Sequence, residues 1–200
     1  MTSETFCFDN EDRLEVTEIA HKLYARSLVT AFDGNISLRH GDYLLITPTH
    51  LCKGDVLPED LVITDRQGKV VLGDKRPSSE ILMHLAVYEK EPAISCIVHA
   101  HPVAATAIWR NGNSPDTTIL MEAEMNLAGL IMVGPEKAGS TDLAEAVAGQ
   151  VTAVKGACMI ERHGAVTWGQ NLKETYYRME SLERLAQTAF MISCCEQCKE

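Results

Sequence analysis

Two histidines, His99 and His101, stand one residue apart at the end of an apolar run over residues 94–98, and Pro102 follows them directly. If this run is a β-strand, alternate side chains share one face of the sheet, so both imidazoles project to the same side, about 6–7 Å apart at Cα. Two ring nitrogens at that spacing can bind one divalent cation at about 2.0–2.1 Å. Because proline ends a strand, we expect the pair at the exposed end of the strand rather than deep in the sheet.

A third histidine, His163, follows a second apolar run over residues 157–161. We expect Gly164 to take backbone angles that a side chain forbids, so that a bend there aims His163 sideways. Three neutral imidazoles with one open position form a common catalytic zinc site. A pair alone fits equally well two histidines that only make hydrogen bonds, so the hypothesis depends on the third. The other histidines are interpreted as parts of helices, turns or loops: His21, His40, His50 and His84.

The composition is that of one globular domain spanning residues 1–200, with 46% apolar and 23% charged residues. A net charge of -10, without a basic run longer than a pair, argues against nucleic-acid binding. No apolar stretch reaches the roughly 18–20 residues of a membrane span, and the N-terminus lacks the basic and apolar regions of a signal peptide. We therefore expect a cytoplasmic protein that binds no membrane.

The chain has seven cysteines, which is an odd number. Cys96 and Cys158 fall inside the two apolar runs and are expected as small buried apolar residues.

Hydrophobic periodicity predicts helices that cover a mainly antiparallel sheet. The predicted helices span residues 11–28, 81–88, 103–110, 122–128, 143–151 with Ser140 as its cap, and 172–194. The predicted strands span residues 35–39, 43–46, 61–64, 69–72, 94–98, 130–133, 157–161 and 165–168. The first four strands form two hairpins.

Five short motifs occur along the chain in an order known from one family: Gly34-Asn35-Ile36-Ser37, Thr47-Pro48-Thr49, Pro77-Ser78-Ser79-Glu80, His99-Ala100-His101-Pro102 and Arg162-His163-Gly164. Over residues 11–192 the chain resembles the class II aldolase/adducin family, in particular its L-fuculose-1-phosphate aldolase branch. The resemblance implies a three-layer α/β/α fold with a central, mainly antiparallel sheet. It also implies assembly as a cyclic homotetramer.

The resemblance further implies a set of site residues. The zinc ligands would be His99, His101 and His163, and Glu80 would sit by the metal and shuttle the substrate proton. The implied phosphate pocket has five members: Gly34, Asn35, Thr49, Ser78 and Ser79.

These roles have physical reasons of their own. Zinc withdraws electrons from a chelated carbonyl and hydroxyl, so it can stabilise an enediolate formed by carbon–carbon cleavage. A carboxylate beside the metal can move the proton if its environment tunes its pKa toward the working pH. Hydroxyls, an amide and backbone N–H groups at a helix start can hold an anion without an arginine.

Each residue outside the histidines also has a simpler interpretation. Ser78 and Ser79 before a helix are by default an N-cap, and Glu80 in a first turn suits the helix dipole. Asn35 after Asp33-Gly34 is by default a turn residue. The three histidines are what favours the functional interpretation.

The chain departs from the family in three places. The segment 117–124 lacks the tyrosine that family aldolases carry there, and Glu122 or Glu124 would be its replacements, or simply surface carboxylates. His50 stands where a glycine often follows Thr-Pro-Thr. The functional C-terminal tail of the family is not found after the last predicted helix.

The leading hypothesis is a zinc-dependent aldehyde-lyase that cleaves a small phosphorylated ketose by a retro-aldol step. Decarboxylation, dehydration or epimerisation of a sugar-derived substrate would use the same ligands. A third hypothesis is a non-catalytic module like the adducin head domain, in which loss of metal ligands would be expected.

Overall fold

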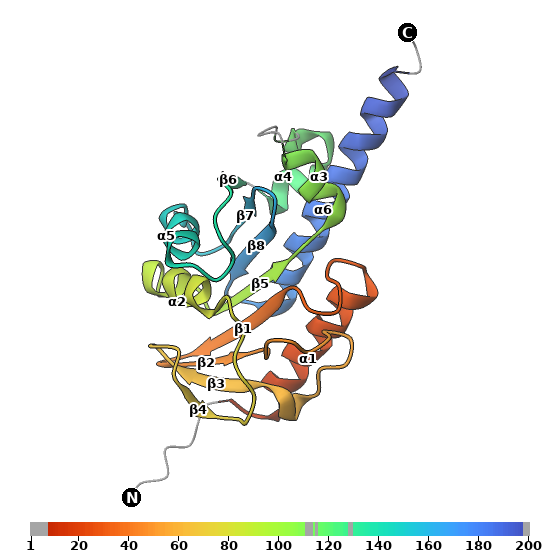
Figure 1. Ribbon diagram of the computed structural model, residues 1–200. Helices are drawn as coiled ribbons and strands as arrows, with labels where there is room; N and C mark the ends of the chain where they lie inside the picture. Colours follow the sequence, from red (N-terminus) through yellow and green to blue (C-terminus); the bar gives the residue numbers. More distant parts are fainter. Residues whose placement is uncertain (1–7, 111–113, 115, 128–129, 198–200) are drawn as a thin grey trace, which may run out of the picture.

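Eight strands form one sheet in the computed structural model of the protein, which describes residues 8–110, 114, 116–127 and 130–197 (Figure 1). The strands are β1 (Asn35–His40), β2 (Tyr43–Ile46), β3 (Val62–Asp65), β4 (Val70–Leu72), β5 (Cys96–Ala100), β6 (Ile131–Val133), β7 (Gly156–Ile160) and β8 (Gly164–Gly169). Their order across the sheet is β4-β3-β2-β1-β5-β8-β7-β6. All neighbours are antiparallel except β6 and β7, which are parallel. The prediction of a mainly antiparallel sheet is confirmed.

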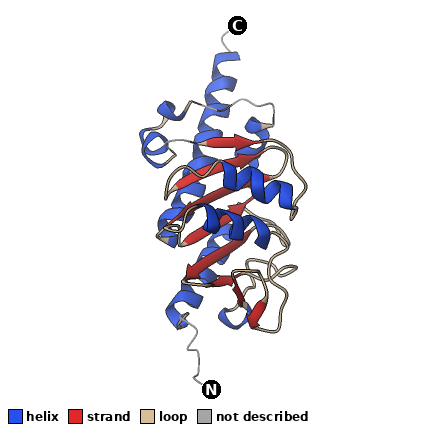
Figure 2. Cartoon of the chain, turned by 90° about the vertical axis from the view of Figure 1, so that its left-hand side faces the viewer, coloured by secondary structure: helices blue, strands red, loops and turns tan. Residues whose placement is uncertain are grey.

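Helices cover both faces of this sheet, as Figures 1 and 2 show from two directions. Helices α2 (Ile81–Lys90) and α5 (Thr141–Gly149) pack against each other on one face. The opposite face carries α1 (Asn10–Ala25), α3 (Val103–Trp109), α4 (Met121–Asn126) and the long α6 (Leu172–Gln197). Two short 3-10 turns, η1 (Pro58–Asp60) and η2 (Thr117–Ile119), lie in the connections. The α/β fold with three layers is therefore the one predicted.

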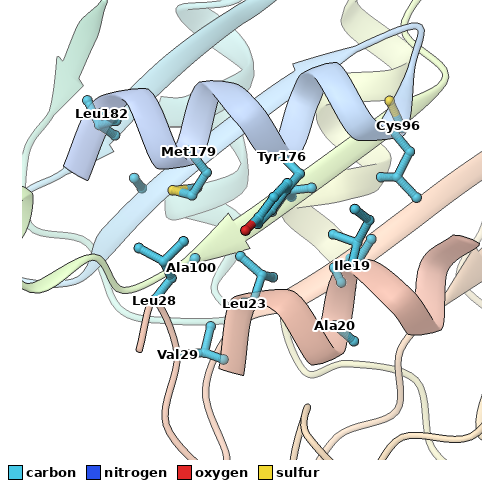
Figure 3. Packing of buried hydrophobic residues seen from close by; sticks show 14 of the residues in the cluster. Ile19, Ala20, Leu23, Leu28, Val29, Cys96, Ala100, Tyr176, Met179 and Leu182 are labelled. Atoms are coloured by element: carbon cyan, nitrogen blue, oxygen red, sulfur yellow. The ribbon is translucent and has the colours of Figure 1, made fainter. Parts of the chain in front are cut away.

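The two apolar clusters follow from the alternation of side chains along the central strands. Cys96, Val98 and Ala100 of β5 belong to the cluster under α1 and α6, whereas Ile97 belongs to the cluster under α2 and α5. Figure 3 shows part of the first cluster, in which side chains of α1 and α6 meet over β5. Because His99 lies two residues after Ile97, it projects to the face that carries α2. Cys96 and Cys158 are fully buried, as expected.

Helix ends are where the structure differs most from the predicted elements. Helix α1 ends at Ala25 instead of residue 28, because Ser27 has a left-handed φ of 56°. Leu28 then enters the core from a loop. Helix α5 begins at Thr141, and the Ser140 hydroxyl accepts a hydrogen bond from the Leu143 amide at 3.1 Å, which confirms the predicted cap. Within the described part of the chain, no helix is both long and apolar enough to cross a membrane.

Candidate metal centre

His99 and His101 lie at the end of β5, in the middle of the sheet. Strand β5 continues to Ala100 because His99 pairs with Asn35 of β1 on one side and with Val166 of β8 on the other. The expectation of an exposed pair is wrong for His99, whose side chain is 0% exposed, while that of His101 is 27% exposed. Pairing on both edges of the strand, together with cover from α2, removes His99 from solvent.

The bend that brings His163 to the pair lies at Arg162, not at Gly164 as expected. Arg162 has a left-handed φ of 59°, whereas Gly164 is the first residue of β8 and has no positive φ. Gly164 is needed for close approach instead. A Cβ atom there would lie 2.4 Å from the Ala100 carbonyl oxygen and 2.7 Å from Cδ2 of His101. The glycine lets β8 run against the end of β5 without displacing the His101 ring.

This close approach predicts that Gly164→Ala disturbs the site without touching a ligand. We expect a loss of about 1–3 kcal/mol in the free energy of unfolding, because an added methyl group forces its neighbours apart. We also expect a decrease of roughly 10- to 100-fold in metal affinity, typical of disturbed support around a ligand. Gly149→Ala is the matched control, since a Cβ atom there meets nothing within 4 Å. Thermal denaturation and metal titration check both values, and a Gly164→Ala protein that matches the control contradicts the assignment.

Three imidazoles and one carboxylate meet at this point. The ring centroids of His99, His101 and His163 lie 4.9–5.0 Å apart in all three pairs. Glu80, at the start of α2, reaches the same point: its Oε2 is 3.0 Å from Nε2 of His99, and its Oε1 is 3.3 Å from Nε2 of His163. One ligand atom from each of the four residues lies within 4.8 Å of all the others. The structure thus brings together the three histidines and the glutamate that were singled out; we call this group the histidine–glutamate cluster.

The donor set fits a divalent cation. Nδ1 of His99 donates to the Ala165 carbonyl at 2.9 Å, so in the neutral ring the Nε2 lone pair faces the cluster. Nε2 of His101 lies only 3.1 Å from Nε2 of His99. Oε1 of Glu80 is buried and has no hydrogen-bond partner among the described residues. Converging lone pairs beside a carboxylate need a positive charge, which a metal ion supplies.

The same need for positive charge appears in the pKa values of the cluster. Burial alone lowers the pKa of His99, but the Glu80 carboxylate outweighs it and holds this pKa above its ordinary value. Burial raises the pKa of Glu80, while His99, His163 and Asn35 outweigh it and hold the pKa below its usual range. Burial and the other two rings lower the pKa of His101 to about 3. These opposite shifts show that the Glu80 carboxylate favours a positive charge beside it, which a divalent cation at the same point would supply.

A buried polar network behind the cluster contains residues that were not singled out from the sequence. The Asn35 amide donates to Oε2 of Glu80 at 2.9 Å, and its carbonyl oxygen accepts from Nε2 of His84 at 2.6 Å. Nδ1 of His84 then accepts from the Ser37 hydroxyl at 2.6 Å, and Ser37 contacts the Tyr88 hydroxyl at 2.7 Å. Burial lowers the pKa of His84 to about 3, so its ring is neutral and can both donate and accept. Because Asn35 bonds both Glu80 and His84, this network fixes the orientation of the Glu80 carboxylate.

A signal for this network was present in the sequence. Asn35 and Ser37 alternate on one face of a strand, and Glu80, His84 and Tyr88 recur every four residues on one face of a helix. His84 was instead interpreted as an ordinary helix residue. Asn35 is therefore already bonded to Glu80, in addition to its implied place in the phosphate pocket.

The residues of the implied phosphate pocket line one cavity of about 150 Å³ that also reaches Glu80, His101 and His163. They are Gly34, Asn35, Thr49, Ser78 and Ser79. Two backbone hydrogen bonds of 3.1 Å join the loops that carry them, from Thr49 to Arg76 and from Ser78 to Thr47. Gly34 has a φ of 68°, and a Cβ atom there would lie 2.4 Å from Cγ1 of Val29, so both the backbone and the space require glycine. Lys53 lines the same cavity and was not predicted.

The structure also shows where the residues lie that depart from the family pattern. His50 has a left-handed φ of 57°, so it keeps the backbone conformation that glycine takes easily. Glu122 and Glu124 lie on α4, and Glu122 lines a different cleft together with Glu183 and Arg184. Neither glutamate is brought to the cluster, and among the described residues no tyrosine lines the cavity.

Comparison with known proteins agrees with this geometry. The chain matches the Class II Aldolase and Adducin N-terminal domain family over residues 14–190, and it belongs to that family. Class II aldolases depend on a divalent metal, and the histidine–glutamate cluster is a candidate site for one.

Relatives within this family carry names for different reactions. An L-fuculose phosphate aldolase from Methanococcus maripaludis is 33% identical over 91% of this chain and 98% of its own length. A methylthioribulose-1-phosphate dehydratase from Acidiphilium cryptum is 30% identical over 92% of this chain and 89% of its own. The crystal structure of YgbL from Klebsiella pneumoniae, a candidate aldolase/epimerase/decarboxylase, has a TM-score of 0.79 and 31% identity over 90% of this chain and 88% of its own.

Proposed function

We propose that the protein is a zinc-dependent lyase that cleaves a small phosphorylated ketose by a retro-aldol step. The observation that carries this proposal is the histidine–glutamate cluster, which borders a cavity that is also lined by the hydroxyls of Thr49, Ser78 and Ser79. A ketose phosphate has the matching groups, a carbonyl with a neighbouring hydroxyl at one end and an anion at the other. His99, His101 and His163 would hold a divalent cation, which would supply Lewis-acid polarisation of the substrate carbonyl.

Glu80 is the residue that we propose moves a proton. Retro-aldol cleavage breaks the bond between the carbon next to the carbonyl and the carbon that bears the far hydroxyl. The hydroxyl loses a proton, and the carbon next to the carbonyl gains one. Glu80 is buried, bonded to Asn35 at 2.9 Å, and lines the cavity, so its carboxyl group is placed to deliver or remove the proton at that carbon.

Ser78, Ser79, Thr49 and Gly34 are proposed to hold the phosphoryl group. The Ser78 hydroxyl accepts a hydrogen bond from the Glu80 amide at 3.2 Å, which leaves its own proton free to donate to a phosphoryl oxygen. The positive end of α2 lies at the same point.

Decarboxylation, dehydration or epimerisation is the second candidate function. The relatives' names favour it, since one is a dehydratase and another a candidate epimerase or decarboxylase. All these reactions develop negative charge next to a carbonyl, so the same cluster serves them. A non-catalytic, adducin-like module is less well supported, because all three imidazoles are retained.

Product analysis separates these functions. Purified protein loaded with zinc, and in parallel with manganese, cobalt or iron, is incubated with a panel of sugar phosphates. We expect an aldehyde and a three-carbon ketose phosphate as products. Carbon dioxide, water loss or an epimerised sugar without cleavage would assign the second candidate instead. A purified protein that binds no metal and turns over no substrate would be the module.

We also propose a homotetramer, as the family resemblance implies. The end of α6 extends beyond the sheet in Figure 1, and its Phe190, Met191 and Ile192 are exposed. Exposed neighbouring apolar residues of this kind favour contact with another subunit. Cytoplasmic localisation stays a prediction.

A further inference from the structure

Lys53, in the loop between β2 and η1, is a buried cation with too few partners. Its side chain is among the largest fully buried ones in the described part of the chain, with 1% of the residue exposed. Its ammonium group donates to the Leu51 carbonyl at 3.0 Å. No described carboxylate forms an ion pair with it, so two of its three N–H donors have no partner among the described residues.

A buried ammonium group without a counter-charge is costly, and proteins usually pair it. The carboxylate that acts on its charge is Asp33, which also lines the cavity and raises the pKa of Lys53 against the lowering effect of burial. The Asp33 carboxylate forms no ion pair with Lys53; its contacts are to the Thr30 hydroxyl at 2.9 Å and to Nδ1 of His101 at 3.5 Å. Lys53 therefore lines the cavity with N–H donors to spare and without a carboxylate in direct contact with its ammonium group.

The cavity itself indicates what these donors can bind. Among the described residues that line it, Lys53 is the only lysine or arginine, and it stands with Thr49, Ser78 and Ser79. These hydroxyls can donate hydrogen bonds to phosphoryl oxygens but cannot neutralise them. The walls also carry the carboxylates of Asp33 and Glu80, and the whole protein has a net charge of -10. A phosphate dianion in this cavity therefore needs a local cation.

We propose that Lys53 binds the phosphoryl group of the substrate and sets the preference of the cavity for phosphorylated over neutral sugars. The inference rests on the proposed function only in that the substrate carries a phosphoryl group; it does not depend on which bond is broken.

The test compares two probes that differ only in the phosphoryl group, dihydroxyacetone phosphate and dihydroxyacetone. Calorimetric titration of the zinc-loaded protein is carried out for wild type, for Lys53→Met, and for Lys69→Met as the control at an exposed lysine of the β3–β4 turn. We expect Lys53→Met to weaken binding of dihydroxyacetone phosphate by about 10- to 100-fold, the range for a lost hydrogen bond to a charged group. Its affinity for dihydroxyacetone and its zinc content should equal those of the control.

Three results would overturn the inference: unchanged affinity of Lys53→Met for dihydroxyacetone phosphate, an equal loss for both probes, or a wild type that does not prefer the phosphorylated probe. Where Lys53→Met does not fold, a crystal structure of wild type with dihydroxyacetone phosphate decides, because Nζ must then lie within hydrogen-bond distance of a phosphoryl oxygen. Selective binding through Lys53 without cleavage of any sugar phosphate would reject the lyase and leave this inference standing.

Discussion

The His99→Ala variant is expected to lose both the metal and all measurable turnover. His99 supplies one of three imidazoles and lies in the middle of the cluster, 3.0 Å from Glu80 and 3.1 Å from His101. Since changes that only disturb the support of a ligand reduce metal affinity by about 10- to 100-fold, removal of a ligand should reduce it by more than that. The Ala165 carbonyl also loses its hydrogen bond, at a cost of about 1–3 kcal/mol in the free energy of unfolding.

Metal content of the purified variant and zinc titration measure this loss. His21→Ala is the matched control, because His21 is an exposed histidine of α1 and contributes no atom to the cluster. Circular dichroism shows whether each variant is folded. A folded His99→Ala protein with wild-type zinc content and activity would reject the metal centre, and with it the proposed lyase.

Glu80→Gln is expected to separate metal binding from chemistry. Glutamine keeps the shape of the side chain and can still accept from the Asn35 amide, and all three imidazoles remain. Zinc should therefore stay bound, while the rate constant of turnover should fall by about 100- to 10,000-fold, the usual contribution of a positioned acid or base.

The measurement pairs steady-state kinetics with metal analysis on the same preparation. Glu145→Gln, at an exposed position of α5, controls for the loss of one carboxylate. If Glu80→Gln turns over substrate at the rate of this control, the proton is moved by another group. If it instead loses its zinc, Glu80 acts mainly as a fourth ligand.

The order of elements and the face that each histidine occupies could be predicted from the sequence, because both follow from local periodicity. Alternation along residues 96–100 places His99 and His101 together, and the structure bears this out. His163 was predicted from its place after a second apolar run, whereas Glu80 came from the family resemblance, since no local pattern relates it to the histidines. That residues 1–200 form a single domain stays a prediction.

Tertiary contacts explain what could not be predicted. The left-handed turn falls on Arg162, because Gly164 is committed to the close approach of β8 and β5. The burial of Lys53 has no local signal at all, since a lysine between Cys52 and Gly54 is typical of a solvated loop. His84 had a signal in its spacing from Glu80, and its neutral, bonded state became visible only with Ser37 and Asn35 on the facing strand.

The histidines of the cluster stand at strand ends, whereas much of the cavity wall comes from loops, and the two parts can therefore change independently during evolution. Two imidazoles stand at the end of β5 and a third beside the start of β8, where pairing with neighbouring strands leaves little room for change. Other parts of the wall come from the connections around residues 47–53 and 76–79 and from Ala138, which lie outside the strands of the sheet. Mutations in these connections can therefore reshape the cavity while the candidate metal centre is left intact. Relatives of similar sequence are indeed named for different reactions.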